Sequence, residues 1–211
     1  MNPQLQATCE SALKGRQLLE HSFYRRWEAG ELTLGELRSY AEQYRHFETM
    51  LPDFLERLGK ELAPGTAREL VLDNLSDEAG PPSHLELFEL FATFLGAQRA
   101  PASPAMKHLV ESYYELLEQN PAAALAGLLA YESQGAAIAD SKVGGLARQY
   151  GATPEATEFW TVHGSVELDH ARWTQDALSS LQPDLIEVDS AMRLIGDAWW
   201  AFLDEREALA A

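Results

Sequence analysis

The sequence contains a single cysteine, Cys9, and therefore cannot form an internal disulfide. Structural disulfides are typical of secreted proteins, so we expect a cytoplasmic protein. The first ten residues, MNPQLQATCE, lack the basic and apolar regions of a signal peptide. No apolar run approaches the roughly 18 residues that a transmembrane helix needs. We therefore expect no membrane partner.

Basic residues are also scarce. Lys and Arg total 16 against 33 Asp and Glu, which gives a net charge of −17. Binding to nucleic acid requires clustered positive charge that neutralises phosphates, so we expect no nucleic-acid partner. The hydrophobic content of 46% and the charged content of 23% are ordinary for a folded protein. Part of the acidic excess is available as ligands for a buried cation.

Strand alternation, low-complexity runs and linkers are absent as well. Nearly every segment has the period of a helix, and short turns rich in proline and glycine separate the segments. We predict an all-α protein with a single domain over residues 1–211, built as a bundle of seven or eight helices. The first helix is predicted over residues 4–28. A second helix is predicted to start at the capping box of Thr33 and Glu36 and to be interrupted at Pro52.

Three metal-capable side chains follow one another in the segment TVHGSVELDHARW, residues 161–173. At roughly 100° per residue, Glu167 lies about 40° from His163 on the helix, and His170 lies about 20° to the other side. The three side chains therefore leave one helix as a single row. Two imidazoles and a carboxylate suit iron, manganese or zinc. The alternative is a polar helix face with two incidental histidines.

The other ligands of a dinuclear site should come from facing helices, as in carboxylate-bridged bundle proteins. Glu132 lies within the apolar segment ALAGLLAYESQGAAIA, where a buried charge is costly unless it is paired or metal-bound. Glu78 and His84 flank the chain break SDEAGPPSH, and the turn between them can direct both at one point. The candidate ligands, three carboxylates and three imidazoles, are Glu78, His84, Glu132, His163, Glu167 and His170. This set suits two divalent ions that activate oxygen.

The chain resembles the heme-oxygenase-like di-metal oxidases in four segments. It is most similar to the CADD-type proteins (Chlamydia protein associating with death domains), which are related to PqqC and TenA. The segments are LEHSFYRRWEAGELT (19–33), VLDNLSDEAGPPSH (71–84), AYESQGAAIADSKVGGL (130–146) and HGSVELDH (163–170). The resemblance implies a heme-oxygenase-type bundle, a homodimer and metal binding by the same six residues.

Two features differ from the family pattern. The turn that precedes His84 is one residue shorter, so Asp77 competes with Glu78 as the ligand. The acid between the last two histidines is often aspartate in the family, whereas this chain has Glu167. The longer side chain can alter the metal–metal distance or the preferred metal.

The CADD-type proteins are linked to the synthesis of p-aminobenzoate (4-aminobenzoate) for folate. In that chemistry the protein consumes one of its own tyrosines as the ring source, and a lysine is implicated as the amino donor. The matching residues are Tyr24 and Lys142. The resemblance thus implies an oxygen-dependent oxidoreductase with two iron or manganese ions that acts on itself. Tyr44, His46 and Tyr131 lie in segments that match the family's pocket, and we expect them to line it.

Other enzymes of this fold remain open as alternatives. The first is an oxidase that uses the same metals on an external small molecule. The second is a metal-free enzyme of cofactor biosynthesis like PqqC or TenA, although Cys9 is poorly placed to be the nucleophile of a TenA-like hydrolase. A heme oxygenase would use His21 as its proximal ligand and would leave the six metal ligands without a purpose. Nothing in the chain supports a death-domain partner.

Overall fold

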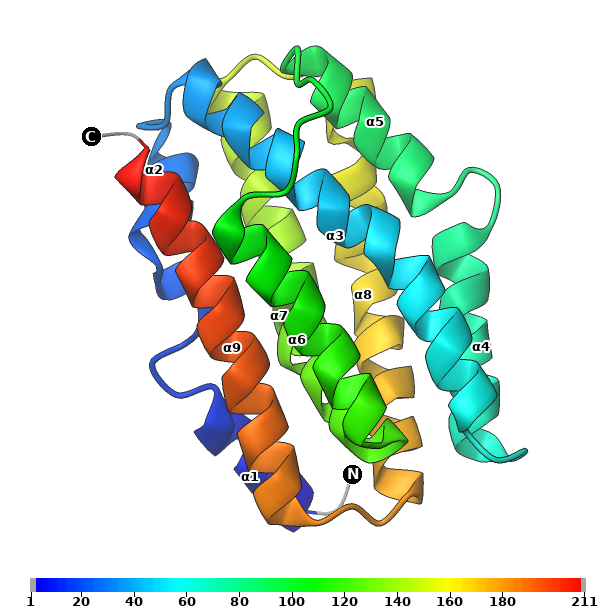
Figure 1. Ribbon diagram of the computed structural model, residues 1–211. Coiled ribbons are helices and arrows are strands. Elements are labelled where there is room, and N and C mark those ends of the chain that lie inside the picture. The colour runs from blue at the N-terminus through cyan, green and yellow to red at the C-terminus, as the bar shows by residue number, and fades with distance from the viewer. Residues whose placement is uncertain (1–2, 210–211) are drawn as a thin grey trace.

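A computed structural model describes residues 3–209 of the chain, so the four remaining positions of the predicted domain lie outside the described residues. Within this range the chain forms nine α-helices and one short 3₁₀ turn, and no strand (Figure 1). The helices are α1 (Pro3–Ala12), α2 (Ser22–Ala29), α3 (Leu34–Glu61), α4 (Thr66–Ala79), α5 (His84–Phe94), α6 (Pro104–Gln119), α7 (Pro121–Gln149), α8 (Pro154–Ser180) and α9 (Leu185–Ala208). The prediction of an all-α protein is confirmed.

The helix predicted over residues 4–28 is divided, and that prediction was wrong. Helix α1 ends at Ala12, and Gly15 then adopts a left-handed conformation with φ of 75°. Glycine tolerates this conformation because it has no Cβ atom. Helix α2 starts anew after His21, whose Nδ1 atom accepts a hydrogen bond from the backbone N–H of Phe23 at 3.1 Å. The side chain of His21 is thus an N-cap.

The interruption predicted at Pro52 is also wrong, because α3 continues through this residue to Glu61. A proline inside a helix removes one hydrogen bond and costs about 3 kcal/mol. The flanking turns bury Phe47, Leu51, Phe54 and Leu55. Each of these side chains contributes about 1.5–3 kcal/mol when it leaves water, and together they offset that cost. The capping box of Thr33 and Glu36 forms as predicted.

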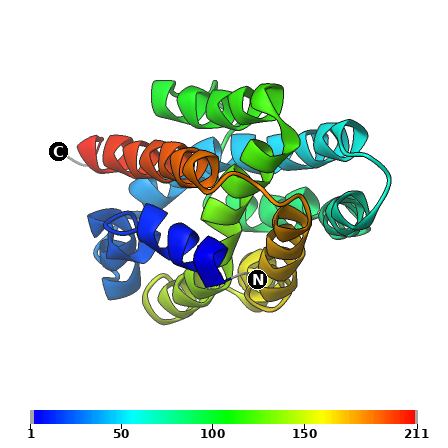
Figure 2. The same ribbon diagram turned by 90° about the horizontal axis from the view of Figure 1, so that it is seen from below.

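Helix α7 passes through the middle of the bundle. It packs against α2, α6, α8 and α9, and its apolar first half is buried on nearly all sides (Figures 1 and 2). Helices α3, α4 and α5 pack on one another, and both α4 and α5 also pack against α8. The bundle therefore brings the interior faces of α3, α4, α5, α7 and α8 together.

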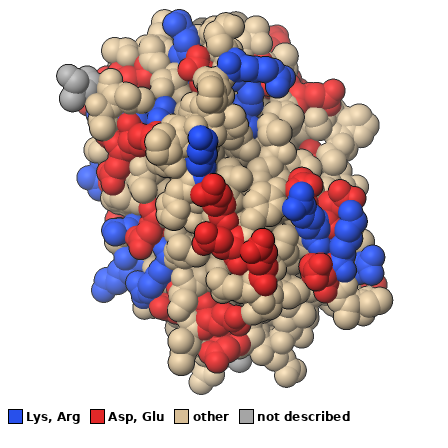
Figure 3. Space-filling model, viewed as in Figure 1, with Lys and Arg blue, Asp and Glu red and all other residues tan. Residues whose placement is uncertain are grey.

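The surface reflects the acidic composition. On the face drawn in Figure 3, acidic side chains gather near the centre, and basic side chains lie mainly toward the edges without forming a continuous patch. Among residues 3–209, no helix combines the length and the apolar character that are needed to cross a membrane.

Candidate metal centre

The row of side chains predicted on α8 forms as expected. His163, Glu167 and His170 are all buried, and they follow one another on the interior face of the helix. The Nδ1 atom of His163 hydrogen-bonds to the carbonyl oxygen of Phe159 at 2.9 Å. This contact fixes the ring and leaves Nε2 available, 3.8 Å from Glu167 Oε1. A hydrogen bond to the second nitrogen is what orients a metal-binding histidine.

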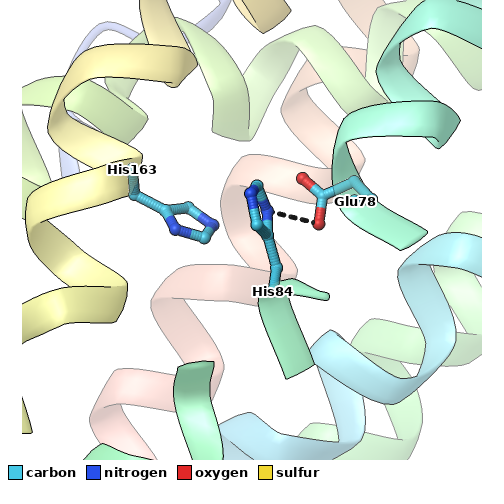
Figure 4. Close-up of side chains that lie close together, drawn as sticks. All are labelled: Glu78, His84 and His163. Carbon is cyan, nitrogen blue, oxygen red and sulfur yellow. Dashed lines mark ion pairs between the residues drawn. The ribbon is translucent and has the colours of Figure 1, made fainter. Parts of the chain in front are cut away.

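The turn between α4 and α5 brings Glu78 and His84 to the same place. Oε2 of Glu78 lies 2.7 Å from Nδ1 of His84, yet Nδ1 has no partner in hydrogen-bond geometry. The ring of His84 lies between Glu78 and His163, with its centre 4.3 Å from that of His163 (Figure 4). Potential ligand atoms of all three residues lie within 4.8 Å of one another. Such convergence of oxygen and nitrogen donors suits a transition metal ion.

Asp77 and Glu78 occupy different environments. Glu78 is buried, with its Oε1 atom 3.5 Å from Nδ1 of His170. The Asp77 side chain is 43% exposed, and its Oδ2 atom lies 3.4 Å from Nε2 of the same imidazole. Glu78 therefore joins the interior cluster, while Asp77 contacts His170 from the solvent side. The geometry favours Glu78 as the ligand of the two.

Glu132 and Glu167 complete the group of predicted ligands, and each has an unsatisfied oxygen. Glu132 accepts a hydrogen bond from the Asn74 amide at 2.7 Å through Oε1, but its Oε2 atom has no partner among the described residues. Oε2 of Glu167 has none either. Burial raises the pKa of Glu132 to about 8 and that of Glu167 well above its usual value.

Buried carboxylates without partners are unfavourable, and a bound cation would satisfy them. Three features of the cluster fit iron or manganese. They are the unsatisfied carboxylate oxygens, the His163 imidazole oriented through Nδ1, and the mixture of oxygen and nitrogen donors. Direct contacts thus link Glu78, His84, His163, Glu167 and His170. The buried carboxyl group of Glu132 is near enough to raise the pKa of Glu167. The role of all six residues as ligands stays a prediction.

The space for the Glu167 carboxyl group depends on Gly135 of α7. A Cβ atom at this position would lie 2.6 Å from both Cδ and Oε2 of Glu167, which is too close for any real contact. The lack of a side chain at Gly135 therefore makes room for a glutamate. The sequence segment AYESQGAAIA contains this glycine, but its position against α8 becomes evident only in the folded chain.

A second cluster contains the two residues predicted to be consumed. The Lys142 amino group, on α7, donates a hydrogen bond to the Tyr40 hydroxyl at 2.7 Å. That hydroxyl also lies 2.9 Å from the hydroxyl of Tyr24 on α2. All three side chains are at most 2% exposed. The Lys142 amino group lies 5.0 Å from the centre of the Tyr24 ring and 3.7 Å from that of Trp160.

Burial sets the protonation of this cluster. It lowers the pKa of Lys142 well below the usual value, although Glu48 and Glu167 act in the opposite direction. It also raises the pKa of the Tyr24 phenol. Loss of hydration disfavours the charged form of each group, so burial favours the uncharged amine of Lys142 and the intact phenol of Tyr24.

Two of the three predicted pocket residues lie beside this cluster. The hydroxyls of Tyr44 and Tyr131 are 2.6 Å apart, and the Tyr44 ring stacks on that of Tyr40. His46 lies elsewhere: it is half-buried, and its Nε2 atom is 2.9 Å from the carbonyl oxygen of Ala100, between α5 and α6. The expectation that His46 lines the pocket is not supported.

The sequence reasoning missed Tyr40 and Glu48, which are both buried on α3. A usable signal was present, since Tyr40, Tyr44 and Glu48 are four residues apart. This spacing places all three near one face of a helix.

The chain is similar to known proteins over most of its length. The sequence model of a family described as iron-containing redox enzyme matches residues 38–200. A 4-aminobenzoate synthase of Nitrosomonas europaea is 35% identical, over 92% of this chain and 87% of that protein. A 4-aminobenzoate synthase of Chlamydia muridarum is 31% identical, over 92% of this chain and 86% of that protein.

Solved structures show the same fold. A TenA homologue from Pseudomonas syringae superimposes with a TM-score of 0.83 at 15% identity, covering 97% of this chain and 91% of that chain. A CADD-like protein from Nostoc punctiforme gives 0.75 at 18% identity, covering 98% and 95%. A domain with a heme oxygenase-like fold from Shewanella denitrificans also gives 0.75, at 17% identity, covering 98% and 90%. The predicted heme-oxygenase-like fold is confirmed.

Proposed function

The chain belongs to the family of iron-containing redox enzymes, and on this premise we propose that it is an oxygen-dependent 4-aminobenzoate synthase that consumes its own side chains. Family membership makes the chain an oxidoreductase. Two curated relatives, at 35% and 31% identity, carry the name 4-aminobenzoate synthase. In our proposal Tyr24 supplies the aromatic ring, Lys142 supplies the amino group, and the product feeds folate synthesis.

The observation that carries this proposal is the position of Lys142 beside Tyr24. The amino group lies 5.0 Å from the centre of the Tyr24 ring, and Tyr40 hydrogen-bonds to both residues. The rings of Tyr44 and Trp160 also lie against the amino group, within 4.8 Å and 3.7 Å. Protein atoms thus surround the phenol and the amine on these sides, which favours the protein's own tyrosine over an external substrate.

Two divalent ions, iron or manganese, would be held by the six predicted ligands. These are Glu78, His84, Glu132, His163, Glu167 and His170. When bound, the ions would supply oxygen activation and one-electron oxidation. The fully buried Lys142 and Tyr24 are protected from water, which otherwise quenches reactive intermediates.

The chain's own groups prepare the two reacting side chains. Burial lowers the pKa of Lys142 and thereby favours the neutral amine, whose free lone pair makes it the nucleophilic form. A proton released by the Tyr24 phenol can pass to the Tyr40 oxygen 2.9 Å away. Tyr40 is in turn 2.7 Å from Lys142, which can hold the proton. The hydrogen bonds therefore give the phenolic proton a route that does not need water.

Replacement of Tyr24 tests this function. We expect Tyr24→Phe to abolish 4-aminobenzoate formation while metal content, measured by elemental analysis, remains that of the wild type. The control is Tyr114→Phe, which removes a peripheral hydroxyl that donates to Asp53 at 2.7 Å and should retain activity. Product formation by the Tyr24→Phe variant would show that the ring comes from elsewhere. An external substrate would leave the intact mass of the wild-type protein unchanged after exposure to oxygen.

A further inference from the structure

Glu48 of α3 is a buried carboxylate to which neither the predicted ligand set nor the proposed chemistry gives a role. It is 2% exposed, and its Oε2 atom has no hydrogen-bond partner among the described residues. It lies one helical turn beyond Tyr44, whose hydroxyl is 2.6 Å from that of Tyr131 and also lowers the pKa of the Glu48 carboxyl group through a hydrogen bond, so only Oε2 lacks a partner. Other glutamates of the same helix are exposed and carry no cost of removal from water. The burial of Glu48 therefore calls for a partner.

The surroundings of Glu48 are those of the metal centre. Its pKa is raised well above the usual value by burial first and by the carboxyl group of Glu78 second, while Tyr44 and Lys142 act in the opposite direction. Glu48 in turn contributes to the raised pKa of Glu167. The ring of Phe47, the residue before Glu48, lies 5.2 Å from that of Tyr131, the residue before Glu132. The ring of Tyr44, one turn earlier, lies 6.5 Å from that of Phe159, whose carbonyl oxygen contacts His163. The turn of α3 that carries Glu48 thus packs against residues that adjoin predicted ligands on α7 and α8.

In their ionised forms, the buried acids of the bundle outnumber the buried cations that could balance them. Among residues 3–209 the buried acids are Glu48, Glu78, Glu132 and Glu167, and three of them have an unsatisfied Oε2 atom. The buried arginines Arg45 and Arg206 are already paired with Glu89 and Glu205. Burial lowers the pKa of Lys142 and so disfavours its positive charge. Four ionised carboxylates would balance the four positive charges of two divalent ions. Three carboxylates would leave one positive charge unbalanced.

We propose that Glu48 is a further metal ligand, which adds a carboxylate from α3 to the six predicted from the sequence. The site then draws on α3, α4, α5, α7 and α8, and it holds four carboxylates and three imidazoles. Di-metal centres in helical bundles commonly use a glutamate from each of several helices, and four carboxylates suit hard divalent cations. This inference rests on the proposed function, because it assumes that the chain binds two metal ions.

The test compares metal binding by three glutamate variants of the full-length protein. Glu48→Gln keeps the shape of the side chain and removes its charge. Glu48→Met replaces the acid with an apolar side chain of similar volume. It can be tested if the buried amide group of Glu48→Gln prevents that variant from folding. Glu56→Gln is the matched control, since Glu56 is exposed on the same helix and its carboxyl group forms a surface ion pair with Lys60. Anaerobic titration with Fe²⁺ or Mn²⁺ against a competing chelator gives stoichiometry and affinity, and circular dichroism verifies folding.

We expect the wild type and Glu56→Gln to bind two ions. In both Glu48 variants one ion should be lost or bound at least about tenfold more weakly, as is typical when a supporting group of a metal site is removed. Folded Glu48 variants that bind two ions with wild-type affinity would overturn the role of Glu48 and leave the proposed function intact. A wild type that binds no metal would overturn both, so the two failures are distinguishable.

Discussion

The amino group of Lys142 on α7 lies 5.0 Å from the centre of the Tyr24 ring on α2, and the Tyr40 hydroxyl hydrogen-bonds to both side chains. The two residues predicted to be consumed are therefore neighbours in the folded chain. Beside them, side chains from α4, α5, α7 and α8 form a cluster of metal-capable groups.

Tyr40→Phe should impair product formation without changing metal content. The variant leaves the Lys142 amino group and the Tyr24 hydroxyl without their shared partner, and an unsatisfied buried polar group costs about 1–3 kcal/mol. We expect the apo protein to lose stability of that order in urea unfolding. Tyr114→Phe, at the periphery, should lose less. A fully active Tyr40→Phe variant would exclude Tyr40 from the proton route.

Lys142 should make stability depend on pH. Its folded-state pKa is depressed by burial, so between that value and the unfolded pKa near 10.4 the unfolded chain binds a proton that the folded chain does not. Stability therefore rises as pH rises through this window, and the neutral variant Lys142→Met lacks the dependence. Urea unfolding of the two apo proteins between pH 7.5 and about 9.5 should show the stability advantage of Lys142→Met shrinking by about 1.4 kcal/mol per pH unit. A constant difference would mean that Lys142 is charged in the folded protein.

Gly135→Ala should weaken metal binding because the new methyl group displaces the Glu167 carboxyl group. Adding the shorter Glu167→Asp to this variant should recover part of the affinity, since the aspartate no longer needs the space. Gly144→Ala on the same helix is the control: its methyl group meets only the flexible end of the exposed Arg148 side chain. Chelator competition gives the affinities. Equal affinity of Gly135→Ala and the wild type would contradict the contact.

Glu78 and Asp77 should differ as ligands. Glu78→Gln removes a buried carboxylate that lies 2.7 Å from His84, so we expect loss of at least one metal ion. Asp77→Asn changes a half-exposed partner of His170 and should weaken binding much less. Elemental analysis of both purified variants decides between the two acids. The reverse order of metal loss would assign the ligand to Asp77.

The sequence alone predicted the relative positions of candidate ligands where the helical period or a turn determines the neighbours of a residue. The spacing of His163, Glu167 and His170 places them on one helix face whatever the rest of the chain does. The break between Glu78 and His84 could be located from its glycine and prolines. Both features are local, and the structure shows both.

Tertiary packing decided the remaining features. The spacing of Glu48 from Tyr40 and Tyr44 places the three on one helix face, but only the packing of α3 against other helices buries that face and separates Glu48 from the exposed glutamates of α3. The continuity of that helix through Pro52 depends on apolar contacts with other helices, which no local signal reports. The break after Ala12 follows from the left-handed Gly15 and the cap formed by His21, and a helical apolar pattern on both sides concealed it.

The central claim is that the protein consumes Tyr24. Isotope labelling that traces the origin of the product's aromatic ring tests this claim most directly. Protein made with ring-¹³C-labelled tyrosine should be loaded with Fe²⁺ or Mn²⁺ and exposed to oxygen and reductant with all other components unlabelled. Mass spectrometry should then find 4-aminobenzoate with a fully labelled ring, and peptide mapping should find the loss of mass at Tyr24. Unlabelled 4-aminobenzoate from an intact Tyr24 would contradict the account.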